Sequence, residues 1–142
     1  MLLSGFFALL VLLVPNVELC QCDAEDVEWI EGNSVPKKLC SSPLIIEVKV
    51  TGVDDGPKGM LDYKVQIINI LRGTLNNIQK QGSVLIPLAE PPCYEDFIME
   101  NGEKYVLAVD TVGSHLVLSQ CNYAADIRDL TSIERRAIIE GC

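Results

Sequence analysis

Hydrophobic and polar residues alternate along several short segments of this chain, a pattern that predicts β-strands. The most regular example is residues 44–51, where Leu44, Ile46, Val48 and Val50 alternate with a mostly polar set of neighbours. A period of two places these four side chains on one face of a strand. Residues 44–51 are therefore predicted to form a strand with one buried face.

Four further segments carry the same kind of signal. They are residues 61–71, 82–88, 104–110 and 115–119. Turn-forming residues at 52–59 separate the first strand from the second, and residues 111–114 join the last two. Five short strands with tight turns indicate a mainly β protein, and they favour a five-stranded Greek-key barrel.

Two helices are expected to pack on this barrel. Near the end of the chain, residues 131–134 match a capping box and Gly141 is placed to end the helix. The apolar face of this helix would consist of Ile133, Ala137 and Ile138. Residues 23–39 predict a second, less regular helix that is interrupted by glycine and proline.

The first residues of the chain form an apolar run that predicts export. Residues 1–14 are too short to span a bilayer and suit the apolar region of a secretory signal peptide, so a membrane anchor is the less favoured alternative. We expect a signal peptide at 1–19 and a single domain at 20–142. Cleavage there would make Cys20 the first residue of a secreted, extracellular protein.

The cysteines and the charge narrow the class of protein further. All six cysteines lie after residue 19: Cys20, Cys22, Cys40, Cys93, Cys121 and Cys142. An even count in an exported chain predicts three disulfides, although the spacing alone leaves fifteen pairings open. The net charge is −9, and removing Glu18 with the leader leaves −8. Such an acidic chain is a poor partner for nucleic acids or anionic membranes.

The chain lacks the residues for most catalytic schemes. Its one histidine, His115, lies in an apolar segment and is interpreted as structural, which excludes a catalytic triad. No Cys-x-x-Cys or His-x-x-x-His pair is present, so the chain has no conventional zinc site or other cofactor of its own. The carboxylates at 23–26 and 54–55 are interpreted as solvated charges. We expect a protein that is not an enzyme.

Taken together, several motifs resemble one known family. They are Cys20-x-Cys22, Leu39-Cys40, residues 63–73, Cys93, residues 102–108, residues 120–123 and residues 140–142. This set is similar to the N-terminal inhibitory domain of the tissue inhibitors of metalloproteinases, and the resemblance covers the whole chain after residue 19. It implies an OB-type barrel of the netrin-like class. It also implies three disulfides, which are Cys20–Cys93, Cys22–Cys121 and Cys40–Cys142.

The resemblance also implies a mechanism. The α-amine and carbonyl of Cys20 would bind the catalytic zinc of a secreted or cell-surface metalloprotease, Gln21 would enter the pocket below that zinc, and residues 90–92 would fill the other side of the cleft. The implied protease-binding residues are Cys20, Gln21, Cys22, Asp23, Glu90, Pro91, Pro92 and Cys93. The zinc ion would thus be shared with the target protease, and this protein would have no cofactor of its own.

Two other functions stay open at this point. A netrin-like binding module could use the same barrel to hold a receptor or the extracellular matrix without inhibiting a protease. The other alternative is a secreted protein whose cysteines only stabilise the fold, with no inhibition of a protease and no such binding partner. The binding module and the structural protein do not require a free Cys20 amine, whereas zinc chelation does.

Overall fold

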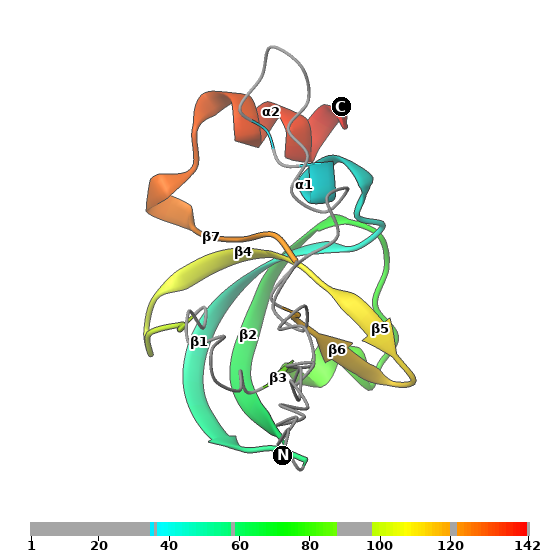
Figure 1. Cartoon of the computed structure of the whole chain (residues 1–142), viewed down its shortest axis with the longest axis vertical. Coiled ribbons are helices and arrows are strands. Elements are labelled where there is room, and N and C mark those ends of the chain that lie inside the picture. Colours follow the sequence, from blue (N-terminus) through cyan, green and yellow to red (C-terminus); the bar gives the residue numbers. More distant parts are fainter. Residues whose placement is uncertain (1–34, 36, 58, 88–97, 120–121, 142) are drawn as a thin grey trace, which may run out of the picture.

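Within the described residues, the β-strands form one curved sheet with the helices at one end (Figure 1). This computed structural model describes residues 35, 37–57, 59–87, 98–119 and 122–141. The strands are β1 Ile45–Asp55, β2 Met60–Arg72, β3 Ser83–Pro87, β4 Lys104–Ala108, β5 Asp110–Val112, β6 His115–Val117 and β7 Ala124–Asp126. The helices are α1 Lys37–Ser41 and α2 Ser132–Glu140, and two 3-10 segments are η2 Gln79–Gln81 and η3 Ile127–Asp129.

The order of the strands makes the sheet close on itself. Neighbouring strands follow the order β5-β6-β3-β2-β1-β4-β7. Strands β4 and β5 are consecutive in the chain, with only Val109 between them, and β5 pairs with β6. The chain therefore connects β4, a neighbour of β1, with the other end of the strand order at β5 and β6. The pairing of β3 with β6 is parallel and the other pairings are antiparallel. This mainly β arrangement is consistent with an OB-like barrel.

The described strands number seven where five were predicted. The predicted strand 104–110 is split at Val109, whose N–H donates to the carbonyl of Leu44 at 3.1 Å. As a result β4 pairs with β1, and only β5 forms the predicted hairpin with β6. The second difference is β7, which lies on the outer edge of β4 and was not predicted.

The hairpin between β1 and β2 is longer than the sequence suggested. Residues 52–55 continue β1 instead of belonging to a turn, and Val53 pairs with Tyr63. A register shift between Val50 and Gly52 marks a β-bulge, which lets the pairing resume after an irregular residue. The connection is therefore confined to residues 56–59, and the two strands extend as a paired arm.

Two hydrophobic clusters flank β1. Ile46, Val48 and Val50 are buried in the barrel interior, so the predicted buried face is confirmed. Ile45 lies on the opposite face but has no exposed surface, because it packs with residues of the two helices, such as Leu39. The helices thus cover the outside of the barrel at the start of β1.

Helix α2 forms where the capping box predicted it. The backbone N–H of Glu134 donates to Thr131 Oγ1 at 3.1 Å, and Gly141 ends the helix with φ of 74°. Both features satisfy backbone groups that a helix end leaves unpaired. Ala137 and Ile138 are buried as predicted, but Ile133, in the first turn of the helix, is 46% exposed, so the prediction that it belongs to the buried face is wrong.

The predicted helix at 23–39 is described only at its end. Helix α1 covers Lys37–Ser41 and so extends two residues beyond the predicted limit. Residues 23–34 and 36 lie outside the described residues. Leu39 is fully buried against α2 and the barrel, which gives this short helix its place in the fold.

Candidate functional site

The residues implicated in protease binding fall outside the described part of the chain. These are Cys20, Gln21, Cys22, Asp23, Glu90, Pro91, Pro92 and Cys93. Cys121 and Cys142 also lie outside it, so the three predicted disulfide pairings remain predictions. Cys40 is described and is disulfide-bonded. The structure does describe the residues on either side of 88–97 and of 120–121.

Strands β3 and β6 bring two cysteine-containing segments to one end of the barrel. Their pairing is parallel, with Val84 opposite Leu116, and the N–H of Leu118 donates to the carbonyl of Leu85 at 2.9 Å. The chain therefore enters residues 88–97 and residues 120–121 from neighbouring strands that point the same way. The first of these segments contains Cys93 and the second contains Cys121.

Asn122 fixes the chain on the far side of residues 120–121. Its backbone N–H donates to the carbonyl of Ser119 at 3.0 Å, and its side-chain Nδ2 donates to the carbonyl of Val117 at 3.2 Å. The next residue, Tyr123, accepts a hydrogen bond from the N–H of Ala108 at 2.9 Å. The backbone is thus fixed to β6 before Cys121 and to β4 after it.

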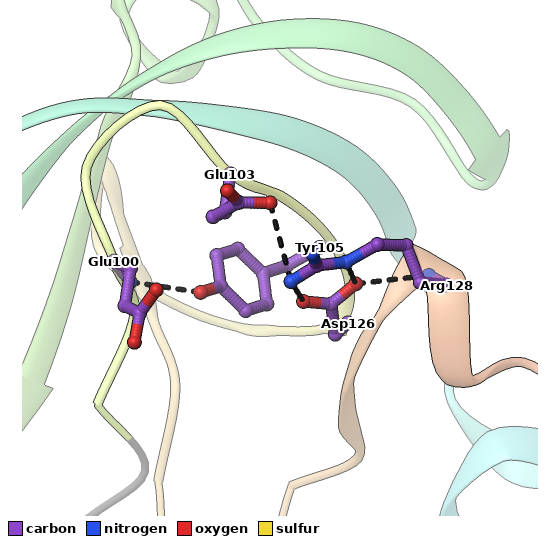
Figure 2. A network of polar contacts seen from close by, with 5 residues as sticks. All are labelled: Glu100, Glu103, Tyr105, Asp126 and Arg128. Atoms are coloured by element: carbon purple, nitrogen blue, oxygen red, sulfur yellow. Dashed lines mark hydrogen bonds and ion pairs between the residues drawn. The ribbon is translucent and has the colours of Figure 1, made fainter.

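The segment 88–97 is likewise held at both of its ends. Pro87 ends β3 and lies opposite Met60 of the β1–β2 hairpin. After the segment, Met99 is only 4% exposed and packs into the barrel core. The N–H of Glu100 then donates to the hydroxyl of Tyr105 at 2.8 Å (Figure 2). A loop anchored at both ends has less conformational entropy to lose on binding.

An ion-pair network lies beside the hydrogen bond between Glu100 and Tyr105 (Figure 2). Arg128 donates from Nε to Asp126 Oδ1 at 3.0 Å and from Nη2 to Asp126 Oδ2 at 2.7 Å, and Glu103 lies 3.4 Å from the same Nη2. The side-chain hydrogen bonds from Arg128, helped by its backbone N–H, lower the pKa of Asp126 to about 2. Hydrogen bonding to Asp126 in turn raises the pKa of Arg128.

A second polar contact joins Tyr123, the residue directly before β7, to helix α2. The hydroxyl of Tyr123 donates to Glu134 Oε2, and Glu134 Oε1 accepts from the hydroxyl of Thr131 at 3.0 Å. Burial raises the pKa of Tyr123, and the bond to Glu134 raises it further. Tyr123 therefore stays a neutral hydrogen-bond donor. No local pattern predicted this contact, because Tyr123 and Glu134 are 11 residues apart in the sequence.

Among the residues that the structure describes, no group of three or more His, Cys, Asp and Glu side chains is placed to hold a metal ion. His115 is exposed on β6. No helix in the described ranges is long and apolar enough to cross a membrane.

The described residues thus define a mainly β protein with an OB-like barrel, in which the parallel strands β3 and β6 lead into residues 88–97 and 120–121. Residues 20–141 match the model of the family described as tissue inhibitor of metalloproteinase. The chain therefore belongs to this family, whose members inhibit metalloproteinases and are not enzymes. The family implies metalloproteinases as partners, and its members are generally extracellular. No individual curated protein matches the chain.

Proposed function

We propose that this protein is secreted and inhibits zinc metalloproteases by binding the catalytic zinc through the α-amine and carbonyl of Cys20. The observation that carries the proposal is the family match, which begins at residue 20. The predicted signal peptide ends at the residue before it, Leu19. The same cleavage would therefore release the protein and create its zinc-binding group.

The chemistry requires no side chain. An N-terminal amine and the carbonyl of the same residue can close a five-membered ring around a metal ion. The catalytic zinc of a protease has three protein ligands and one exchangeable position, which normally holds the attacking water. An α-amine with a pKa of about 7.7–8.0 loses its proton readily near neutral pH. Occupying that position removes the nucleophile.

The parallel pairing of β3 and β6 supports the placement of Cys20. Both strands deliver the chain to the same end of the barrel, and each is followed by a segment with one cysteine, Cys93 or Cys121. The proposed bonds Cys20–Cys93 and Cys22–Cys121 would attach the N-terminus to these two segments.

The neighbouring segments would complete the inhibitory surface. Residues 90–92 would lie beside the zinc-binding amine, and two prolines in that stretch restrict its backbone before binding. The tip of the β1–β2 hairpin, residues 56–59, belongs to the same edge, because Met60 pairs with Pro87. We propose that this tip touches the rim of the protease cleft.

The mechanism is tested by blocking the amine alone. We would compare the protein beginning at Cys20 with a form carrying one extra N-terminal Ala, against a panel of secreted zinc proteases. The extra residue turns the amine into an amide, so inhibition should be lost. A circular dichroism spectrum and thermal midpoint that match the native protein would show that the fold is intact.

Each outcome of this comparison has a clear meaning. Equal inhibition by the extended and native forms would refute chelation by Cys20. If mass analysis confirms a free Cys20 amine and neither form inhibits any protease, the netrin-like binding module becomes the better description.

The specificity of inhibition is expected to depend on Gln21. A buried amide that lacks hydrogen-bond partners costs roughly 1–3 kcal/mol, whereas a threonine has less polar surface to satisfy. We expect Gln21→Thr to strengthen or broaden inhibition, by roughly five- to hundredfold on proteases with an apolar pocket. Inhibition constants for both forms provide the measurement. No change on any protease that the native form inhibits would place Gln21 outside the pocket.

A further inference from the structure

Helix α1 and the last turn of α2 lie side by side on the outside of the barrel (Figure 1). Cys40 belongs to α1, is partly buried at this junction and is disulfide-bonded. Helix α2 ends at Glu140, and the chain then continues through Gly141 to Cys142. A bonded cysteine on one helix therefore lies beside the chain that leads from the other helix to Cys142.

Arg72 connects the two helices through hydrogen bonds to their backbone carbonyls. It is half-buried at the end of β2 and lies opposite Ile45 of β1, so its side chain leaves the sheet on the face that the helices cover. Its Nη1 donates to the carbonyl of Cys40 at 3.0 Å, and its Nη2 donates to two carbonyls in the last turn of α2 at 3.0 and 3.3 Å. A Cβ placed on Gly141 would lie 3.9 Å from the same Nη2. One guanidinium thus contacts the backbone of Cys40 and lies beside the residue that precedes Cys142.

We propose that Arg72 positions Cys40 and Cys142 for their disulfide during oxidative folding. This inference rests on the implied pairing of these two cysteines and does not depend on inhibition of a protease. The two cysteines are far apart in the sequence, so bringing them together costs chain entropy. A junction that already holds both helix ends raises the effective concentration of one thiol at the other.

The reaction is thiol–disulfide exchange, with oxidised glutathione as the oxidant. The thiolate of one cysteine attacks the glutathione disulfide and releases one reduced glutathione. The thiolate of the other cysteine then displaces the second glutathione from the mixed disulfide, so two electrons and the two thiol protons pass from the protein to glutathione. Only this second step depends on the distance between Cys40 and Cys142, and it is the step that Arg72 assists.

The test measures each disulfide separately in glutathione buffers. The protein that begins at Cys20 would be equilibrated at stepped ratios of reduced to oxidised glutathione, its free thiols trapped by alkylation and its bonds identified by peptide mapping. We expect Arg72→Met to make the Cys40–Cys142 bond about tenfold easier to reduce, and Arg72→Lys about threefold, because one ammonium cannot reach both helix ends. Arg135→Met removes an exposed charge from α2 and should change this ratio by less than about twofold.

The remaining disulfides provide an internal control. A general loss of stability would make every bond easier to reduce by a similar factor, whereas a positioning role acts on the Cys40–Cys142 bond selectively. The bonds of Cys93 and Cys121 should therefore shift by less than about twofold in every variant. Circular dichroism would confirm that each variant is folded at the ratios compared, and Arg72→Lys decides the matter if Arg72→Met is not. Equal shifts of all bonds, an unchanged Cys40–Cys142 bond in a folded Arg72 variant, or a native bond from Cys40 to another cysteine would each overturn the proposal.

Discussion

Replacing Arg72 with methionine is expected to destabilise the fold strongly. Arg72 ends β2 and lies between the two helices, where its Nη1 donates to the carbonyls of Leu39 and Cys40 at 3.0 Å and of Ser42 at 3.2 Å. Its Nη2 donates to the carbonyl of Ala137 at 3.0 Å and to that of Ile138 at 3.3 Å. One side chain thus satisfies carbonyls at the ends of both α1 and α2.

The size of the effect follows from these contacts. The two terminal nitrogens carry four hydrogens for five contacts, so some bonds are shared and the five do not act independently. Two to three independent charge-assisted bonds at about 1.5 kcal/mol each give a loss of about 3–5 kcal/mol. That is a large part of the roughly 5–15 kcal/mol by which a domain is usually stable. Arg72→Lys should retain about half, because a single ammonium cannot serve both helices.

Urea unfolding followed by circular dichroism, with the disulfides intact, measures the difference. Arg135→Met is the matched control, since Arg135 is exposed on α2 and its loss should change the free energy of unfolding by no more than about 0.5 kcal/mol. A loss below about 1 kcal/mol for Arg72→Met, or equal losses for the two variants, would refute the idea that Arg72 joins the helix ends. Native-state hydrogen exchange at the end of α2 should become faster in Arg72→Met alone.

Two further predictions concern the barrel. The pKa of Asp126 is lowered from 3.8 to about 2, so its stabilising effect is fully present above pH 3.8 and is lost as the pH falls through about 2. The difference in the free energy of unfolding between the native protein and Asp126→Asn, measured by urea unfolding, should therefore shrink over that pH range. A constant difference would contradict this prediction. Gly82→Ala should lower the free energy of unfolding by more than about 2 kcal/mol, because Gly82 has φ of 87° and a Cβ there would lie 2.1 Å from the carbonyl oxygen of Val65. In the control Gly52→Ala, the new Cβ meets nothing within 4 Å, so the loss should be less than about 1 kcal/mol. Equal shifts of the thermal midpoint in the two variants would contradict this prediction.

The elements with strong local patterns were predictable from the sequence. Alternation located β1, and its inward face of Ile46, Val48 and Val50 is buried as expected. The capping box located α2, where Thr131 accepts the expected bond. In both cases the signal lies within a few consecutive residues, so no knowledge of the rest of the fold is required.

The elements that depend on a neighbour were not predictable. Strand β7 consists of Ala124, Ala125 and Asp126, none of which favours a strand, and it forms because β4 offers an edge to pair with. The alternating pattern places Ile45 on the face of β1 opposite Ile46, Val48 and Val50, and that face is covered at its start by α1 and α2. The split at Val109 likewise reflects a change of partner from β1 to β6, which no local pattern encodes.

The feature most relevant to inhibition belongs to this second group. A strand pattern shows that residues 83–87 and 115–117 are extended, but not that they pair in parallel. Only the parallel pairing makes β3 and β6 deliver the chain to the same end of the barrel, from which it continues into residues 88–97 and 120–121. The proposed bonds Cys20–Cys93 and Cys22–Cys121 would join the N-terminus to both of these segments. An N-terminus held by two adjacent bonds would present its amine rigidly, and rigidity before contact reduces the entropy lost on binding zinc.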